Sequence, residues 1–311
     1  MSISGILPIN KPEGMRSTYC VQKVRGILGK KTKTGHGGTL DSTASGLLLL
    51  LIGQATRLSN FVMSMPKCYE AEVTFGTETS TDDASGDITA KADWKHITEN
   101  VADSALCGFL GWRMQSPPAV SAVHIDGKRA HTLARSGSAI VPDAKPVHFI
   151  GISRTSAIDG EGRVNFRINC CKGTYIRSFA RDLGRALGSA AHVSKLKRVS
   201  CGIFDLNTAK DAEKIFAMTQ DDAVAEIVPM TSLWKKFPCF AADGAAFDSL
   251  SHGRETSLSS LGKYTVPQSF ALNGKIISAS EKIFSICTHR KSGGTFLLAP
   301  EVNIIMTETN E

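Results

Sequence analysis

The residues best suited to chemistry lie in a glycine-rich segment that ends in an aspartate. Its members are Gly35, His36, Gly37, Gly38, Thr39, Leu40 and Asp41. Glycines let the backbone approach a ligand closely, and His36 has a flat ring that can stack or hydrogen-bond. A carboxylate at the end of such a loop can act as a nucleophile, a general base or a metal ligand. Asp41 is therefore the first candidate for a catalytic residue.

Two other interpretations of Asp41 are open on the residues alone. One histidine and one aspartate five residues apart make half of a metal site, and no ligand cluster follows, so we expect no metal. An aspartate ahead of the apolar run 47–52 is also suited to cap the first turn of a helix. That run is short enough to be either a buried helix or a strand.

A second segment combines basic residues with helical spacing. Arg177, Arg181 and Arg185 follow one another every four residues, so they share one face of a helix predicted over about 174–187. Three like charges in a row repel each other unless an anion or carboxylates lie opposite. This face is therefore predicted to contact phosphate groups, with a solvated basic face as the alternative. The basic character continues at Lys195, Lys197 and Arg198.

Tyr69 stands at the head of a predicted strand, 69–75, in which apolar and polar residues alternate. An aromatic side chain in this place can stack on a nucleic-acid base. A tyrosine packed into the core is the simpler interpretation of this residue taken alone.

Strands and helices alternate along the chain without a regular order. Strands are predicted over 5–9, 69–75, 147–155 and 164–171, and helices over about 18–28, 97–110 and 174–187. Ser17 and Thr18 can cap the first helix. From about residue 234, short strands separated by Gly and Ser turns predict a small all-β module. This order favours an α+β fold over a doubly wound sheet.

The composition is that of a globular protein with an anionic partner. Hydrophobic residues make up 42% and charged residues 21%, which excludes wholesale disorder. A net charge of +7 fits nucleic acid or a membrane surface, although it also serves solubility. No signal peptide or membrane-length apolar run is evident, so we expect a cytoplasmic protein with eight reduced cysteines.

Several blocks of residues occur in an order that resembles a known family. They are Asn10-Lys11-Pro12-Glu13-Gly14 with Ser17; the loop 35–41 with Gly46-Leu47; Lys67-x-Tyr69 with Thr81-Asp82-Asp83; Gln115-x-Pro117-Pro118, Ser121-Ala122 and Gly127-Lys128-Arg129-Ala130; Gly173-Thr174-Tyr175-Ile176-Arg177-Ser178; and Ala191-His192-Val193-x-x-Leu196-x-Arg198. Together they resemble the TruB family of tRNA pseudouridine-55 synthases over about residues 5–206.

The resemblance implies an isomerisation that needs no cofactor. The N-glycosidic bond of a uridine is broken, the base turns, and it is rejoined through carbon to the same ribose. Asp41 would supply the catalytic carboxylate, either by attacking the ribose or by abstracting a ribose proton. Arg177 would pair with Asp41, and a neighbouring cation favours an ionised carboxylate.

The resemblance also assigns residues to the target base. That uridine must leave its stacked place in the T loop, which costs a few kcal/mol. By resemblance, His36 fills the space vacated in the loop, Tyr69 stacks on the flipped base, and Tyr175 and Leu196 line its pocket. The segment 113–147 resembles the RNA-gripping insertion of the family.

Five positions depart from the pattern of the family. They are Arg16, Ser42, Val120, His124 and His131. The last three lie in the insertion, so the departures concern the grip on RNA more than the reaction.

We therefore predict a pseudouridine synthase fold with a mixed, mostly antiparallel sheet over residues 1–232, and a small β-rich, PUA-like module over 233–311. We expect the T arm of tRNA as partner, no membrane, no obligate protein partner and a monomer. One rival is the same chemistry on another RNA within a guide ribonucleoprotein, but the chain has no long basic tails. The other is a tRNA-folding helper, against which the set of Asp41, Tyr69 and Arg177 favours an active enzyme.

Overall fold

A ten-stranded mixed sheet forms the centre of the computed structural model, which describes residues 3–120, 124–125, 128–129, 142–230, 239–241, 244–257, 264–265, 275–279, 283–293 and 295–305. The strand order is β14-β1-β3-β12-β4-β11-β10-β7, with β2 beside β3 and β13 beside β12. The pairs β1–β14 and β3–β12 are parallel, and the other pairs of this sheet are antiparallel. The predicted mixed, mostly antiparallel sheet is confirmed.

The strands of the central sheet are β1 (Gly5–Lys11), β2 (Thr34–His36), β3 (Ala44–Ile52), β4 (Lys67–Phe75), β7 (Gly111–Gln115), β10 (Lys145–Arg154), β11 (Arg163–Cys170), β12 (Ala191–Cys201), β13 (Phe204–Asp205) and β14 (Lys210–Asp211). Two small hairpins lie outside it: β5 (Thr77–Thr79) with β6 (Ile88–Lys91), and β8 (His124–Ile125) with β9 (Lys128–Arg129).

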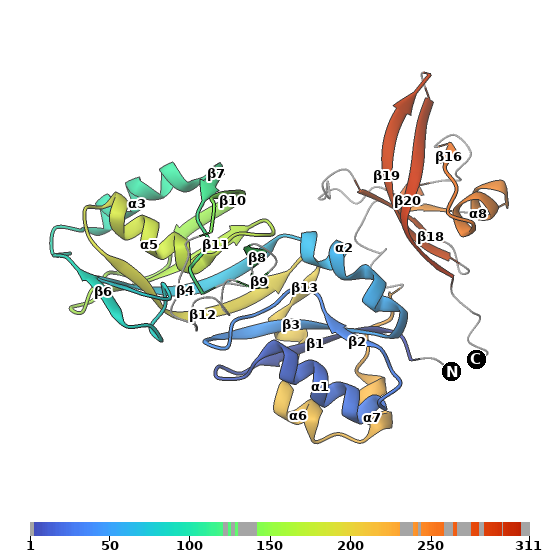
Figure 1. The fold of residues 1–311 in the computed structure, drawn as a ribbon, viewed down its shortest axis with the longest axis horizontal. Helices are drawn as coiled ribbons and strands as arrows, with labels where there is room; N and C mark the ends of the chain where they lie inside the picture. Colours follow the sequence, from blue (N-terminus) through green and yellow to red (C-terminus); the bar gives the residue numbers. More distant parts are fainter. Residues whose placement is uncertain are drawn as a thin grey trace.

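The helices that pack on the sheet are α1 (Ser17–Leu28), α2 (Ser59–Ser64), α3 (Glu99–Leu106), α5 (Ile176–Ala186), α6 (Ala212–Phe216) and α7 (Gln220–Ala225). Short 3-10 turns are η1 (Gly53–Leu58), η2 (Cys107–Phe109) and η3 (Leu206–Thr208). In Figure 1, α1, α6 and α7 gather under β1 and β3, whereas α3 and α5 lie together at the other end of the sheet.

Strand β3 is buried on both faces, which explains its unbroken apolar sequence. Leu47, Leu49 and Leu51 pack with η1 and α2 on one face. Leu48 and Leu50 pack with α1, α6 and α7 on the other face. The run 47–52 is therefore a central strand and not a helix, so Asp41 caps no helix.

The second half of the sheet has a core of its own. Alternate residues of β4, β10, β11 and β12 pack against α3 and α5, with Phe166 and Phe179 in contact at 5.9 Å between ring centroids. The strands predicted over 147–155 and 164–171 are confirmed as the pair β10 and β11. Helix α3 is shorter than the predicted 97–110, because the chain tightens into η2 after Leu106.

The two ends of the range 113–147 belong to the sheet, because β7 pairs with β10 through Lys145 and Gln115. The predicted insertion therefore begins and ends in paired strands. Most of its middle, with His131, lies outside the described residues, as does the side chain of His124.

The C-terminal part contains the short strands that its Gly and Ser turns predict. Its sheet has the order β16-β20-β19-β18-β15-β17. These strands are β15 (Cys239–Ala241), β16 (Thr256–Ser257), β17 (Tyr264–Thr265), β18 (Lys275–Ala279), β19 (Ile283–Ser292) and β20 (Thr295–Ile305), and α8 (Gly244–Ser251) packs beside them. Ile286 and Ile304 join the core cluster of η1 and α2, which attaches the module to the main sheet.

Candidate active site

The backbone on each side of Asp41 is held by the N-terminal segment. The Ser17 hydroxyl donates to the carbonyl of Leu40 at 2.7 Å and accepts from its N–H at 2.9 Å. The N–H of Gly14 donates to the carbonyl of Ser42 at 2.7 Å. Ser17 is therefore a tie to the Asp41 loop, and the prediction that it caps α1 is wrong: residue 16 precedes the helix without a side-chain cap.

Arg198 holds the same loop from the other side. This side chain is only 2% exposed, and its Nε donates to the carbonyl of Leu47 at 2.7 Å. Its two terminal nitrogens donate to the carbonyls of Gly38 at 3.2 Å and Thr39 at 3.4 Å. Arg198 therefore fixes the path of the loop that leads to Asp41.

Gly37 and Gly38 serve packing and backbone conformation within the protein. A Cβ on Gly37 would lie 2.3 Å from a side-chain carbon of Val62 on α2. Gly38 has a φ of +123°, a conformation that favours glycine. These two glycines therefore allow the loop to pack closely against the rest of the protein. From the sequence alone, they were expected to let a ligand approach the backbone.

Arg177 and Asp41 form an ion pair at 2.9 Å between Nη2 and Oδ2. The Arg177 side chain is 6% exposed and the Asp41 side chain 42% exposed. Arg177 also donates to the carbonyls of Thr81 at 2.9 Å and Val120 at 3.1 Å. A buried, fully engaged guanidinium therefore supports a carboxylate that is open to solvent on its other side.

Asp83 is a second carboxylate that faces Arg177, at 3.8 Å from Nη1. Burial raises the pKa of Asp83, but hydrogen bonds from Ser85 and Thr81 outweigh it and leave the pKa below its ordinary value. Thr43 donates to the other carboxylate oxygen at 3.2 Å. Asp83 is therefore ionised at neutral pH and faces the terminal nitrogen of Arg177 that Asp41 does not engage.

The predicted phosphate-contacting face on α5 is wrong, because carboxylates lie opposite its arginines. Arg181 pairs with Asp82 at 2.7 Å, and Arg185 pairs with Glu78 at 2.7 Å. With Arg177, these residues attach α5 to the segment 77–87. That segment contains β5 and buries both acidic partners.

Tyr69 lies on β4, with Arg198 as its register partner on β12. Its half-buried ring packs against the core of the second half-sheet. Burial raises the pKa of Tyr69 to about 12, although the neighbouring Arg198 opposes the rise. The hydroxyl therefore stays protonated at neutral pH, which suits a ring that stacks rather than one that exchanges protons.

Tyr175 and Leu196 lie on two different elements, and only Leu196 shares a cavity with Arg177. The side chain of Gln115 accepts from the N–H of Tyr175 at 2.9 Å and donates to its carbonyl at 3.1 Å, which fixes the start of α5. Leu196 pairs with Ala44 at the start of β3. Arg177 and Leu196 line one cavity of about 180 Å³, together with Thr43.

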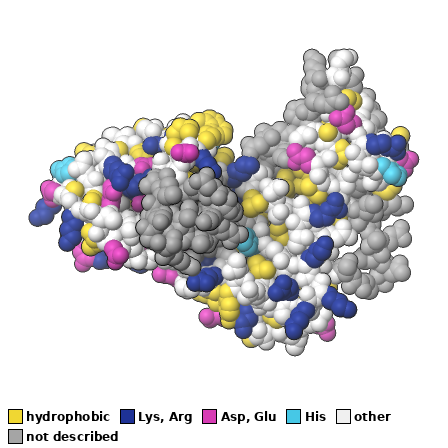
Figure 2. Space-filling model, in the orientation of Figure 1, with side chains coloured by type: hydrophobic (Ala, Val, Ile, Leu, Met, Phe, Trp, Pro, Cys, Tyr) yellow, Lys and Arg dark blue, Asp and Glu magenta, His cyan; other side chains and the backbone are white. Residues whose placement is uncertain are grey.

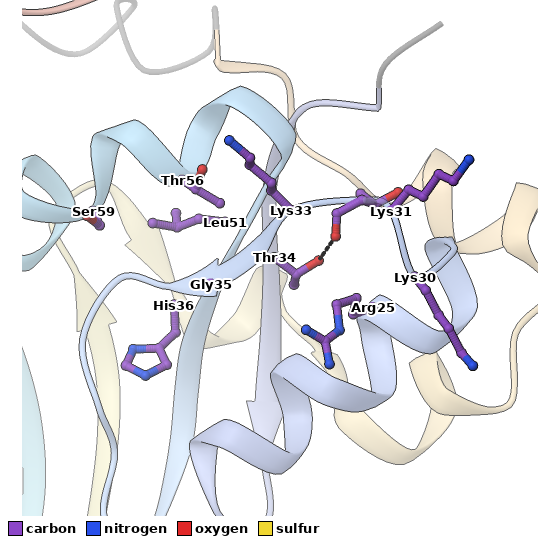
Figure 3. A pocket seen from close by; sticks show the side chains of 11 residues that line it. Arg25, Lys30, Lys31, Lys33, Thr34, Gly35, His36, Leu51, Thr56 and Ser59 are labelled. Carbon is purple, nitrogen blue, oxygen red and sulfur yellow. Dashed lines mark hydrogen bonds between the residues drawn. The ribbon is translucent and has the colours of Figure 1, made fainter.

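His36 lies on β2, opposite Leu50. Its Nδ1 is buried and has no hydrogen-bond partner within the described part of the protein. Burial, and then the nearby Arg198 guanidinium, lower the pKa of His36, so the ring is neutral at neutral pH. His36 is a lining residue of a second, larger cavity (Figure 3), which shares no lining residue with the one beside Arg177.

Comparison with known proteins decides the family. Residues 25–176 match the model of the TruB family pseudouridylate synthase N-terminal domain, and residues 177–233 match the tRNA pseudouridylate synthase B C-terminal domain. The tRNA pseudouridine synthase B of Burkholderia mallei (strain NCTC 10247) is 36% identical over 260 residues, 84% of this chain and 85% of the relative. That of Streptococcus pyogenes serotype M5 is 36% identical over 286 residues, 90% and 96% of the two chains.

The chain belongs to the TruB family of pseudouridine synthases. It is therefore an RNA-modifying isomerase. Two solved structures share the fold of this TruB-family enzyme. A Cbf5-Nop10-Gar1 complex gives a TM-score of 0.70 at 23% identity over 97% of this chain and 84% of that chain. An H/ACA RNP bound to a substrate RNA containing 2'-deoxyuridine gives 0.68 at 20% over 98% and 86%.

Four residues of this TruB-family site have roles that the sequence interpretation missed: Ser17, Asp83, Gln115 and Arg198. The alternation of residues along β12 could have indicated that Arg198 is buried. On a strand, residues 195 and 197 share one face and 196 and 198 the other, so Arg198 had to point away from the two exposed lysines. Lys195 pairs with Glu72 at 3.2 Å, so it adds no free charge to an RNA-binding face either.

Among the residues that the structure describes, no group of three or more His, Cys, Asp and Glu side chains is arranged to hold a metal ion. The seven cysteines whose side chains the structure describes are unbonded. No described helix is long and apolar enough to cross a membrane.

Proposed function

We propose that this TruB-family enzyme isomerises the uridine at position 55 in the T loop of tRNA, with Asp41 as its catalytic carboxylate. The observation that carries the proposal is the 2.9 Å pair of Asp41 with the buried Arg177. A carboxylate held by one oxygen keeps the other available to a ligand. The backbone ties at residues 40 and 42 support the proposal, because they restrict where that carboxylate can point.

The target base is proposed to flip out of the T loop before it reacts, since chemistry on a stacked base requires its extrusion. Tyr69 is assigned the stacking role, and Tyr175 and Leu196 the walls of the base pocket. Their positions on β4, at the head of α5 and beside the start of β3 support this assignment. His36, neutral and without a partner at Nδ1, is assigned to the space that the flipped base leaves.

The proposed partner is tRNA, bound through its T arm by a monomer that needs no other protein. The relatives from Burkholderia and Streptococcus are named as tRNA pseudouridine synthases, and the net charge of +7 suits a polyanion. The proposed domain division is 1–232 for the catalytic domain and 233–311 for the C-terminal module.

The test is to incubate the purified protein with unmodified tRNA transcript, without added metal or cofactor, and to map pseudouridine at each position. We expect product at position 55 alone, and none in a transcript with cytidine at that position. Product confined to another arm would contradict the assigned substrate position.

A further inference from the structure

A basic cavity of about 510 Å³ lies at the far end of β3 from Asp41. Four cationic side chains line it: Arg25, Lys30, Lys31 and Lys33. No acidic residue lines it, and the rest of the lining consists of Thr32, Thr34, Gly35, His36, Leu51, Thr56 and Ser59. Figure 3 shows Arg25 extending from α1 and the lysines spreading from the connection between α1 and β2.

The four cations have no carboxylate partner among the described residues, in contrast to the arginines of α5. All four side chains belong to exposed residues. Figure 2 shows Lys and Arg outnumbering Asp and Glu over the part of the molecule that holds α1 and β2. Like charges left together and unpaired repel each other unless an anion binds between them. The hydroxyl of Ser59 adds a neutral donor of the kind that phosphate oxygens accept.

The distance between the cavity and Asp41 indicates which part of a bound RNA can reach the cavity. Gly35 pairs with Leu51, whereas β3 begins at Ala44, one turn after Asp41. Seven residues at about 3.3 Å per residue put the cavity about 23 Å along β3 from that end. RNA helices are A-form, and a distance of this size covers several base pairs of such a helix. When the target uridine of an RNA lies at Asp41, the part of the RNA that reaches the cavity is therefore several nucleotides away from that uridine.

We propose that this cavity binds backbone phosphates of the helical stem of the substrate RNA, remote from the reacting nucleotide. This inference rests on the proposed function. His36 stands at the boundary between the cavity and the catalytic loop, because it is a lining residue of the cavity and the last residue of β2 before that loop. A volume many times that of one water molecule suits a stretch of backbone rather than a single small ion. The ligand class is a phosphodiester chain, recognised by charge and not by base sequence.

The test compares two double variants with the same change in net charge. Lys31→Ala with Lys33→Ala removes two cavity cations, and Lys91→Ala with Lys95→Ala removes two exposed lysines on or next to β6 that line neither cavity. Binding of unmodified tRNA transcript is measured against salt concentration, because each phosphate contact contributes about 0.7–0.9 to the slope of log K against log salt. With one phosphate contact per lysine, we expect the cavity variant to lower that slope by about 1.4–1.8 and the control variant to leave it unchanged.

A second substrate locates the contact. On a hairpin that keeps the T loop on a shortened stem, we expect the cavity variant and the wild type to bind with the same salt slope. Equal slopes for both variants on full tRNA would overturn the proposal, and so would an equal loss on the shortened hairpin. These binding measurements do not require turnover. If the wild type forms no pseudouridine, the proposed function is refuted. The salt dependence of binding would still show whether the cavity binds phosphates.

Discussion

Lys11 is a buried residue that helps to shape the backbone beside Asp41. Its side chain is fully buried, and its ammonium donates to the carbonyls of Pro12 at 2.8 Å and Met15 at 2.7 Å. These bonds shape the turn whose Gly14 holds the backbone beside Asp41. Burial lowers the pKa of Lys11 from 10.5 to about 8, although Cys20 and Asp41 oppose the change.

Stability should therefore depend on pH through Lys11. Between pH 8 and pH 10.5 the unfolded chain keeps the proton on Lys11 and the folded chain has lost it. The unfolded state binds more protons, so the free energy of unfolding rises with pH in this window, by up to about 3 kcal/mol.

Lys11→Met should remove this rise. The measurement is denaturant unfolding of both proteins across the window, taken as the difference between them, so that other titrating groups cancel. A difference that stays constant from pH 8 to pH 10.5 would show that Lys11 titrates normally in the folded state.

Strands β3 and β12 set the geometry at the scale of elements. They run parallel from Ala44 and Leu196, and their contact is close at Gly46, which has a φ of +104°. A Cβ there would lie 2.3 Å from the carbonyl oxygen of Arg198. The glycine therefore lets β12 approach closely enough for the Arg198 side chain to reach the Asp41 loop.

Gly46→Ala should separate the two strands and loosen the loop. We expect a loss of about 2 kcal/mol or more in the free energy of unfolding, from backbone strain and displaced β12, with a lower turnover rate. Gly26→Ala is the control, since Gly26 lies exposed in α1 with open space around its Cβ position. That change should raise stability by about 0.5–1 kcal/mol. Equal effects of the two substitutions would contradict the role of Gly46.

Alternation predicted strands β4, β10 and β11, because it reports directly which side chains are buried. The unbroken apolar run 47–52 left β3 open between a helix and a strand. The same patterns failed for the arginines of α5. Helical spacing showed that Arg181 and Arg185 share a face, but their partners Glu78 and Asp82 lie about a hundred residues away in the chain. No spacing rule links such distant positions. The carboxylates that face the α5 arginines could therefore be identified only from the three-dimensional structure.

On the two proposals above, chemistry and RNA binding occupy different parts of the molecule. Asp41 pairs with Arg177, whereas the four cations of the basic cavity lie on α1 and on the connection from α1 to β2. Affinity for RNA should depend on the spread of charge over the surface, and turnover on one carboxylate. Removing the carboxylate of Asp41 should therefore abolish turnover and leave the affinity for RNA nearly unchanged.

The most direct test replaces Asp41 with asparagine, which keeps the size of the side chain and removes its charge. Pseudouridine formation at position 55 of unmodified tRNA transcript and binding of the same transcript are measured side by side for both proteins. We predict that Asp41→Asn forms no detectable pseudouridine and binds the transcript with an affinity within a few-fold of the wild type. Turnover at the wild-type rate by the asparagine variant would contradict the assignment of Asp41 as the catalytic carboxylate.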